Sequence, residues 1–269
     1  MTVRERLAAS EREGREALSR LILILDFIEE SRPPPDLRVT MTNSVIVSAL
    51  STAEEAFREL FAEALNILEQ YVPTHDHLNN QLKKANSEKS VDLIRRLLKE
   101  GKKADASLAL RGLSRCLNSE PNYKLATTEL TDNKGNFRSG QLTEISRSLG
   151  VNEIWKLIAE GPEVANLLGG ETDTERATTI LINDWNALFD ERDVIVHRVS
   201  QASGWGSDRM KAAIELAQLV LSRLSAVLER VVSEAVAPWM NSLPNDHRNG
   251  PGSNAAVASR NLNNDLGPS

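Results

Sequence analysis

Residues 207–237 read SDRMKAAIELAQLVLSRLSAVLERVVSEAVA, and their apolar pattern is a clear structural signal. The apolar side chains recur at alternating spacings of four and three residues, at Met210, Ile214, Ala217, Leu221, Leu224, Leu228, Val231 and Ala235. That spacing places all of them on one face of an α-helix that begins near Ser207. Because so long a stripe must be covered, it predicts packing against another long helix, as in a helical bundle.

Two further long helices are predicted nearer the N-terminus. The first runs from about Ser10 to Ser31, and the prolines at 33–35 end it because proline lacks the N–H that a helix needs to continue. The second ends before Pro73 and carries an apolar stripe with the spacing of one helix face. The residues of that stripe are Phe57, Phe61, Ala64 and Leu68.

The remaining long helix is predicted to begin at Thr172–Glu175 and to run to about His197 or Arg198. Its first residues form a capping box, in which Thr172 and Glu175 satisfy the exposed backbone N–H groups of a helix start. Aromatic residues make up only 4% of the chain, and the apolar positions recur at helical rather than alternating spacing. The predicted fold class is therefore all-α.

Shorter elements are expected between Thr74 and Gly170. Brief helices are predicted at Val91–Glu100, Ala106–Leu117, Leu142–Leu149 and Asn152–Ala159, and the longest loop, Thr131–Asn136, consists of turn residues. We expect one helical domain over residues 1–240, in which residues 74–170 are inserted short helices. Residues 241–269 are rich in Asn, Gly, Ser and Pro and are predicted to form a disordered tail.

Composition bears on the compartment and on the kind of partner. The single cysteine, Cys116, cannot form an internal disulfide and is expected to be a small buried hydrophobe in a reducing cytosol. The N-terminus lacks a signal peptide, and the longest apolar run, Leu21–Leu25, is far shorter than the roughly 20 residues that cross a bilayer. We expect a soluble, cytoplasmic protein that does not enter membranes.

The net charge of −6 argues against nucleic-acid binding by a broad basic surface, but it allows a small local site.

The helix that ends near His197 has two distinct faces. Its apolar stripe contains one charge, Arg192, and reads Leu181, Trp185, Leu188, Arg192 and Ile195. A neighbouring polar line reads Asn186, Asp190, Asp193 and His197. A guanidinium in an apolar stripe costs several kcal/mol unless carboxylates or an anionic ligand match its donors. Asp193 or Glu191 could match it from within the chain, and a phosphate could match it from outside.

Arg192–His197 resembles the R-x4-6-H signature of the HEPN (higher eukaryotes and prokaryotes nucleotide-binding) superfamily, in which a polar residue commonly follows the arginine. The helical setting of the signature is similar, and so is the loop and short helix from Gly135 to Val151. The resemblance extends loosely from about residue 15 to residue 240.

This resemblance implies a metal-independent ribonuclease without a cofactor, whose composite site is shared by the two subunits of a homodimer. His197 would move protons to or from the reacting oxygens of RNA, and Arg192 would hold the scissile phosphate. Asp193, one turn before His197, would orient the imidazole. The implied products are a 2′,3′-cyclic phosphate and a 5′-hydroxyl. Such enzymes act in toxin–antitoxin, phage-defence and RNA-processing systems, so an antitoxin or another regulatory protein is an expected partner.

Two other interpretations of the same residues remain open. In one, Arg192 forms a salt bridge with a nearby acid, and His197 is a surface histidine near the negative end of the helix dipole. In the other, the domain keeps these residues but serves as a non-catalytic interaction or dimerisation module.

Other chemically suggestive residues are interpreted more simply. His75-Asp76-His77 has no third metal ligand at a recognisable spacing and is expected to be a solvated loop. Trp205 could stack a base, but we favour a role in covering the end of the bundle. The same loop is flanked by three cations, Arg198, Arg209 and Lys211. They could contact phosphate groups, or they could simply form a solvated charged face.

Overall fold

The computed structural model describes residues 1–132, 137–197 and 205–240, and this part of the chain is helical without strands. The four long helices are α1 (Val3–Ser31), α2 (Pro35–Tyr71), α9 (Thr174–His197) and α10 (Ser207–Met240). The shorter elements are the 3-10 turn η1 (His75–His77), α3 (Asn80–Lys99), α4 (Lys103–Leu117), α5 (Thr127–Thr131), α6 (Ser139–Ser148), α7 (Ile154–Ala159) and α8 (Pro162–Leu167). The all-α prediction is confirmed.

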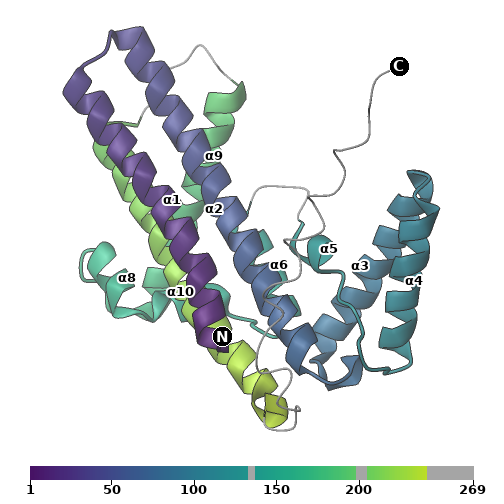
Figure 1. The fold of residues 1–269 in the computed structure, drawn as a ribbon. Helices are drawn as coiled ribbons and strands as arrows, with labels where there is room; N and C mark the ends of the chain where they lie inside the picture. Colours follow the sequence, from purple (N-terminus) through teal and green to yellow (C-terminus); the bar gives the residue numbers. More distant parts are fainter. Residues whose placement is uncertain (133–136, 198–204, 241–269) are drawn as a thin grey trace, which may run out of the picture.

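Helices α1, α2 and α10 pack along one another and form the centre of the molecule (Figure 1). A glycine allows their close approach. A Cβ atom on Gly14 of α1 would lie 2.5 Å from the Cβ of Ala56 in α2 and 2.8 Å from a methyl carbon of Leu221 in α10. The predicted stripe on α2 is buried throughout, from Phe57 to Leu68. One apolar core cluster includes residues from all four long helices.

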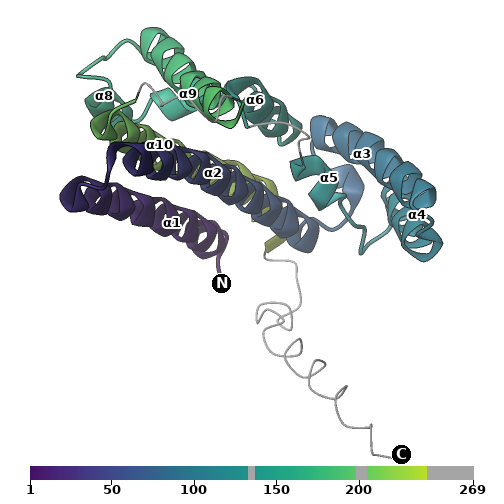
Figure 2. The ribbon, with the colours of Figure 1, turned by 90° about the horizontal axis from the view of Figure 1, so that it is seen from above.

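The remaining helices lie around this centre in two groups. Viewed from above, α9 lies on the opposite side of α2 and α10 from α1, with α6 beside it (Figure 2). Helix α7 packs against α9 and α10. Helices α3 and α4 pack against each other and stand at the end of the molecule away from the α1–α2 turn (Figures 1 and 2).

Four helices begin earlier than the sequence pattern predicted. Helix α4 begins at Lys103 rather than at Ala106, and α6 begins at Ser139 rather than at Leu142. For the other two, α1 and α3, a polar cap explains the start. Thr2 and Glu5 form a capping box that begins α1 at Val3 rather than near Ser10. The Asn79 side chain accepts a hydrogen bond from the Leu82 N–H and begins α3 at Asn80 rather than at Val91. The buried side of α3 includes two polar residues, Asn86 and Ser90, so apolar periodicity did not reveal the helix.

Other boundaries also differ from the predictions. The cap of α9 is Asp173, whose carboxylate accepts hydrogen bonds from the N–H groups of Glu175 and Arg176, and the prediction of Thr172 was wrong. The short helices α5 and α8 were not predicted. Thr131, assigned to the long loop, is the last residue of α5, and residues 133–136 of that loop lie outside the described residues.

The apolar stripe of α10 shifts by one residue near its end. Val231 is half-buried and Ala235 is exposed, whereas Val232 and Val236 are fully buried. An α-helix drifts by about 20° per heptad relative to an exact four-three repeat, so a straight helix buries the next residue after several heptads. The helix also continues through Pro238 to Met240. The predicted tail, residues 241–269, lies outside the described residues.

Within the described ranges, no helix combines the length and apolarity needed to cross a lipid bilayer.

Candidate nucleic-acid cleavage site

The final two turns of α9 carry the residues selected from the sequence. The apolar stripe of this helix is buried at Leu181, Trp185, Leu188 and Ile195, as predicted. Arg192, in the same stripe, is half-buried and its Nε atom is inaccessible to solvent. The guanidinium therefore lies partly within the apolar face of α9, while His197 is exposed at the last residue of the helix.

Because α9 is helical through His197, regular geometry fixes the relation between the candidate residues. Positions five apart are about 140° apart around an α-helix, so Arg192 and His197 point to different sides. Asp193 and His197 are four residues apart and share a face. On one copy of α9, the His197 imidazole therefore shares a face with Asp193. It does not share a face with the Arg192 guanidinium.

The polar line on α9 contacts a segment that follows the undescribed part of the long loop. The two amino groups of the Arg138 guanidinium donate to Asp190 Oδ1 at 2.6 Å and to Asp193 Oδ2 at 2.9 Å. The next residue, Ser139, donates its N–H to Asn186 Oδ1, and the Asn186 amide donates to the Ser139 hydroxyl. Three successive members of the polar line are thus bound by residues 138 and 139.

Further hydrogen bonds fix this segment from its other sides. The Phe137 N–H donates to the buried carboxylate of Glu54 in α2, and the Phe137 carbonyl accepts from the Trp185 indole at 2.8 Å. The Trp155 indole of α7 donates to the Ser139 carbonyl. Residues 137–139 are therefore held by α2, α7 and α9 together, which gives the Arg138 guanidinium a defined position beside Asp193.

Sequence reasoning did not identify Arg138. It is about fifty residues from the acids that it binds, and nothing in its local pattern distinguishes it from the other arginines of the chain. The repeated acids Asp190 and Asp193 were the only signal, because two carboxylates on one helix face favour a nearby cation.

A hollow adjoins this end of α9. It has a volume of about 370 Å³ and lies between Ile195 and Val196 of α9 and the first half of α2. The α2 side is lined by Val39, Thr40, Asn43, Ser44, Val47 and Ser48. Hydroxyl and amide groups therefore face a cavity directly beside the turn that carries Arg192 and His197.

A family comparison covers most of this architecture. A model of the family described as RiboL-PSP-HEPN matches residues 13–230, from α1 to near the end of α10. The chain belongs to the RiboL-PSP-HEPN family. The resemblance inferred from Arg192–His197 and its setting is confirmed. Searches of curated proteins and of solved structures returned no match.

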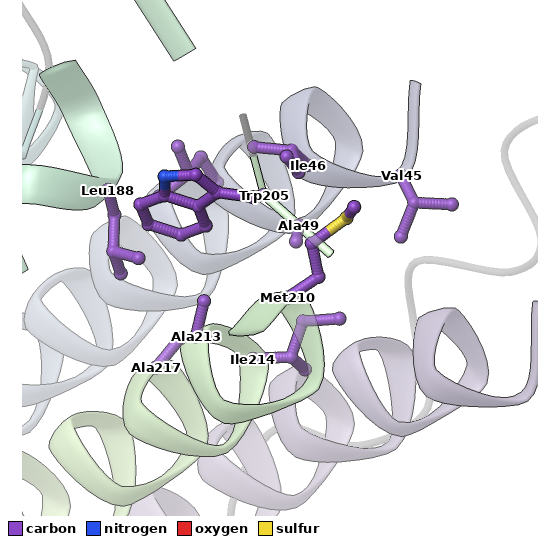
Figure 3. A pocket seen from close by; sticks show the side chains of 10 residues that line it. Val45, Ile46, Ala49, Leu188, Trp205, Met210, Ala213, Ile214 and Ala217 are labelled. Carbon is purple, nitrogen blue, oxygen red and sulfur yellow. The ribbon is translucent and has the colours of Figure 1, made fainter. Parts of the chain in front are cut away.

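In this HEPN domain, Trp205 covers part of the bundle, as favoured from the sequence. Figure 3 shows its indole beside Leu188 of α9 and above Ala213 and Ala217 of α10. The apolar hollow beneath it has a volume of only about 20 Å³, the size of one water molecule. Arg209 lies over the indole ring, 4.1 Å from its centroid.

Lys211 is engaged by two acids of α1. Its ammonium group lies 2.7 Å from Asp26 and 2.8 Å from Glu29, and these contacts raise the pKa of Lys211. This ion-paired arrangement favours the solvated charged face over a phosphate contact. Arg198 lies outside the described residues.

The His75–His77 region differs from its prediction. His75 is buried, and its Nε2 lies 3.3 Å from the side-chain amide of Asn86, so the prediction of a solvated loop was wrong for this residue. Its ring meets Tyr123 edge-on. Across the described residues, no cluster of three His, Cys, Asp or Glu side chains is arranged to bind a metal. Cys116 is buried as predicted, and its burial raises the pKa of the thiol.

Proposed function

We propose that this HEPN domain is a metal-independent endoribonuclease that cleaves RNA by transesterification at Arg192 and His197. The proposal is carried by one arrangement, in which a half-buried guanidinium and an exposed imidazole occupy the last two turns of α9. The family assignment adds support because the matched residues, 13–230, include the segment that resembles the HEPN signature. The adjoining hollow of about 370 Å³ offers room for part of a nucleotide.

The active unit is proposed to be a homodimer. Arg192 and His197 point about 140° apart on one helix, so a single α9 does not direct both at one phosphodiester. A two-fold axis near the end of α9 would bring the guanidinium of one copy to the imidazole of the other. The exposed side chains of Val194 and Val196 on this turn are suited to such a contact.

Within this site, each residue has a distinct chemical task. One His197 imidazole accepts the proton of the ribose 2′-hydroxyl, and the 2′-oxygen attacks the adjacent phosphorus. The bond from phosphorus to the 5′-oxygen breaks, and that oxygen takes a proton from an imidazolium, which gives a 2′,3′-cyclic phosphate and a 5′-hydroxyl. Arg192 binds the phosphate with two parallel hydrogen bonds and stabilises its developing charge.

Asp193 is proposed to orient the His197 imidazole from one turn away. Arg138 then acts as a positioning residue, because its bond to Asp193 Oδ2 sets where that carboxylate can point. The second carboxylate, Asp190, occupies the other amino group of Arg138 and prevents the guanidinium from turning away.

The proposal is tested with labelled RNA in excess EDTA. Wild-type protein is expected to cleave, whereas His197→Ala and Arg192→Ala are each expected to lose roughly a hundredfold or more in rate. Substrate carrying 2′-deoxyribose at the cleaved position should resist, because it lacks the attacking hydroxyl. Equal activity in all three proteins would indicate a contaminating nuclease and would contradict the proposal.

The competing candidate is a non-catalytic interaction or dimerisation module. The observation in its favour is that Arg138 already neutralises two acids of the polar line, which is a structural use of that line. Complete absence of cleavage by a dimeric, folded protein would favour this candidate, unless a bound inhibitor masks the site.

We place the enzyme in a toxin–antitoxin or phage-defence setting, with an antitoxin or another regulatory protein as its partner. Co-purification from the native host, followed by an activity assay after the partner is removed, tests this placement. We further propose that residues 1–240 form one domain, with residues 74–170 as its inserted helices.

A further inference from the structure

The charge of this acidic protein is unevenly distributed. We define the basic hairpin as α3, α4 and their connecting turn, Asn80–Leu117. It contains ten lysines and arginines and four acids, a net charge of +6 in a chain whose total is −6. The rest of the chain therefore has a net charge of −12. The net charge of the whole sequence conceals a strongly basic segment.

Eight of these ten cations are exposed to solvent, and most of the ten are not matched by acids. Among the described residues, three of the ten form ion pairs, namely Arg95 with Asp92, Arg96 with Glu129 and Lys102 with Glu100. Lys99, Lys103, Arg111 and Arg115 are all exposed, at the turn of the hairpin and along the outer face of α4. The hairpin stands at one end of the molecule, clear of α1 and α8 (Figures 1 and 2).

From this arrangement we propose that the basic hairpin binds the phosphate backbone of RNA, at a distance from the cleavage site. Unpaired cations spread over two helices and a turn fit a polyanion with regularly spaced charges. The choice of RNA among polyanions rests on the proposed ribonuclease function.

A protein partner fits the surface less well. Leu108 and Leu110 are both exposed on α4, but positions two apart point about 200° apart on a helix. One partner segment therefore cannot cover both. Leu110 and Leu117, which are seven residues apart and both exposed, share a side of α4. They are only two side chains, whereas the cations are spread over both helices and the turn. Positive charge is the property that the whole hairpin shares.

The position of the hairpin predicts a dependence on RNA length. The hollow at the cleavage site adjoins α2 as far as Ser48, and the hairpin follows the far end of α2 at Tyr71. At 1.5 Å per residue, the two sites are separated by roughly 35 Å along this helix. A stacked strand that advances about 3.4 Å per nucleotide along its axis needs roughly 10 nucleotides to reach both.

The test measures binding of fluorescent 2′-O-methyl RNA, which lacks the attacking hydroxyl and reports binding independently of cleavage. The hairpin variant combines Lys99→Gln, Lys103→Gln and Arg111→Gln. The matched control combines Arg12→Gln, Arg20→Gln and Arg230→Gln, three exposed arginines of α1 and α10. Helical content is checked by circular dichroism, and the pair Lys103→Gln with Arg111→Gln replaces the triple variant if that variant unfolds.

For a strand of about 30 nucleotides, the hairpin variant is expected to lose at least roughly tenfold in affinity, and its log–log salt slope should shrink by about 2. The control variant should bind within about twofold of wild type, and a strand of about four nucleotides should not distinguish the hairpin variant from wild type. Equal losses in both variants, or no binding of the long strand by wild type, would overturn the proposal. Preferential, hairpin-dependent binding of a polyglutamate peptide would also overturn it, in favour of an acidic protein partner.

Discussion

Two histidines in this molecule occupy opposite environments. His75 is buried beside Asn86 and Tyr123, and its neighbours form a closed network with Cys116. His197 is exposed at the end of α9, within two turns of Arg192. Desolvation lowers the pKa of His75, which keeps its ring neutral and structural. A buried histidine whose ring is hydrogen-bonded within the protein contributes to stability. A histidine that is to reach a substrate must instead remain exposed, without such buried contacts.

The largest expected effect lies in the His75 network. Asn86 donates to His75 Nε2 and to Cys116 Sγ, and it accepts from the Ala126 N–H at 2.8 Å. Asn86→Leu removes all three bonds and leaves a buried N–H without an acceptor, so we expect a loss of about 3 kcal/mol in unfolding free energy. Urea denaturation measures this loss.

Asn183→Leu is the matched control, because Asn183 is exposed on α9. It should change the unfolding free energy by less than about 0.5 kcal/mol. Equal effects of the two substitutions would show that the network around His75 is not a special source of stability.

The second effect concerns catalysis at the other histidine. Arg138→Gln removes the two hydrogen bonds from the guanidinium to Asp190 and Asp193, and we expect the cleavage rate at saturating RNA to fall about tenfold, equivalent to about 1.4 kcal/mol. Arg138→Lys should recover part of the rate, because an ammonium group can hold one of the two carboxylates. Single-turnover kinetics provide the measurement.

Arg147→Gln is the control, because Arg147 is exposed in the last turn of α6, the helix that Arg138 precedes, and this variant should cleave at the wild-type rate. An Arg138→Gln variant with full activity would remove Arg138 from its positioning role without affecting the roles of Arg192 and His197.

The third effect is the pH dependence of the stability that the buried His75 contributes. Because the folded-state pKa of His75 is lowered, the unfolded chain binds this proton first as pH falls below about 6.5. The contribution of neutral His75 to stability is therefore present above that pH and is lost as pH decreases toward the folded-state pKa. The slope for one proton is at most about 1.4 kcal/mol per pH unit.

Denaturation midpoints between pH 8 and pH 5.5 should fall less steeply in His75→Gln than in wild type. Parallel pH profiles for the two proteins would mean that other groups cause the acid sensitivity.

The smallest effect is expected at His197 itself. His197→Ala removes an exposed side chain at a helix end, so the unfolding free energy should change by less than about 0.5 kcal/mol. Combined with loss of cleavage, that result would separate function from stability at this position. A loss of stability as large as that of Asn86→Leu would make the two histidines alike and would contradict the comparison.

The sequence predicted the elements whose signal is local and apolar. The stripes of α2, α9 and α10 recur every three or four residues, so the existence of these helices followed from periodicity. Prediction failed where polar residues occupy buried positions, as at Asn86 in α3, or where a short helix depends on packing, as at Val164 of α8. Apolar spacing carries no information about either case.

For the candidate site, the resemblance of Arg192–His197 to the HEPN signature selected Arg192, Asp193 and His197 as a group. Helical geometry is set by the local backbone, so the sequence alone determined which of them share a face. Only the tertiary structure decided that Arg138 meets Asp190 and Asp193, that Asn86 meets His75, and that the basic hairpin lies at the end of the molecule away from the α1–α2 turn. Such contacts depend on how separate helices pack, and packing is set by the whole core rather than by neighbouring residues.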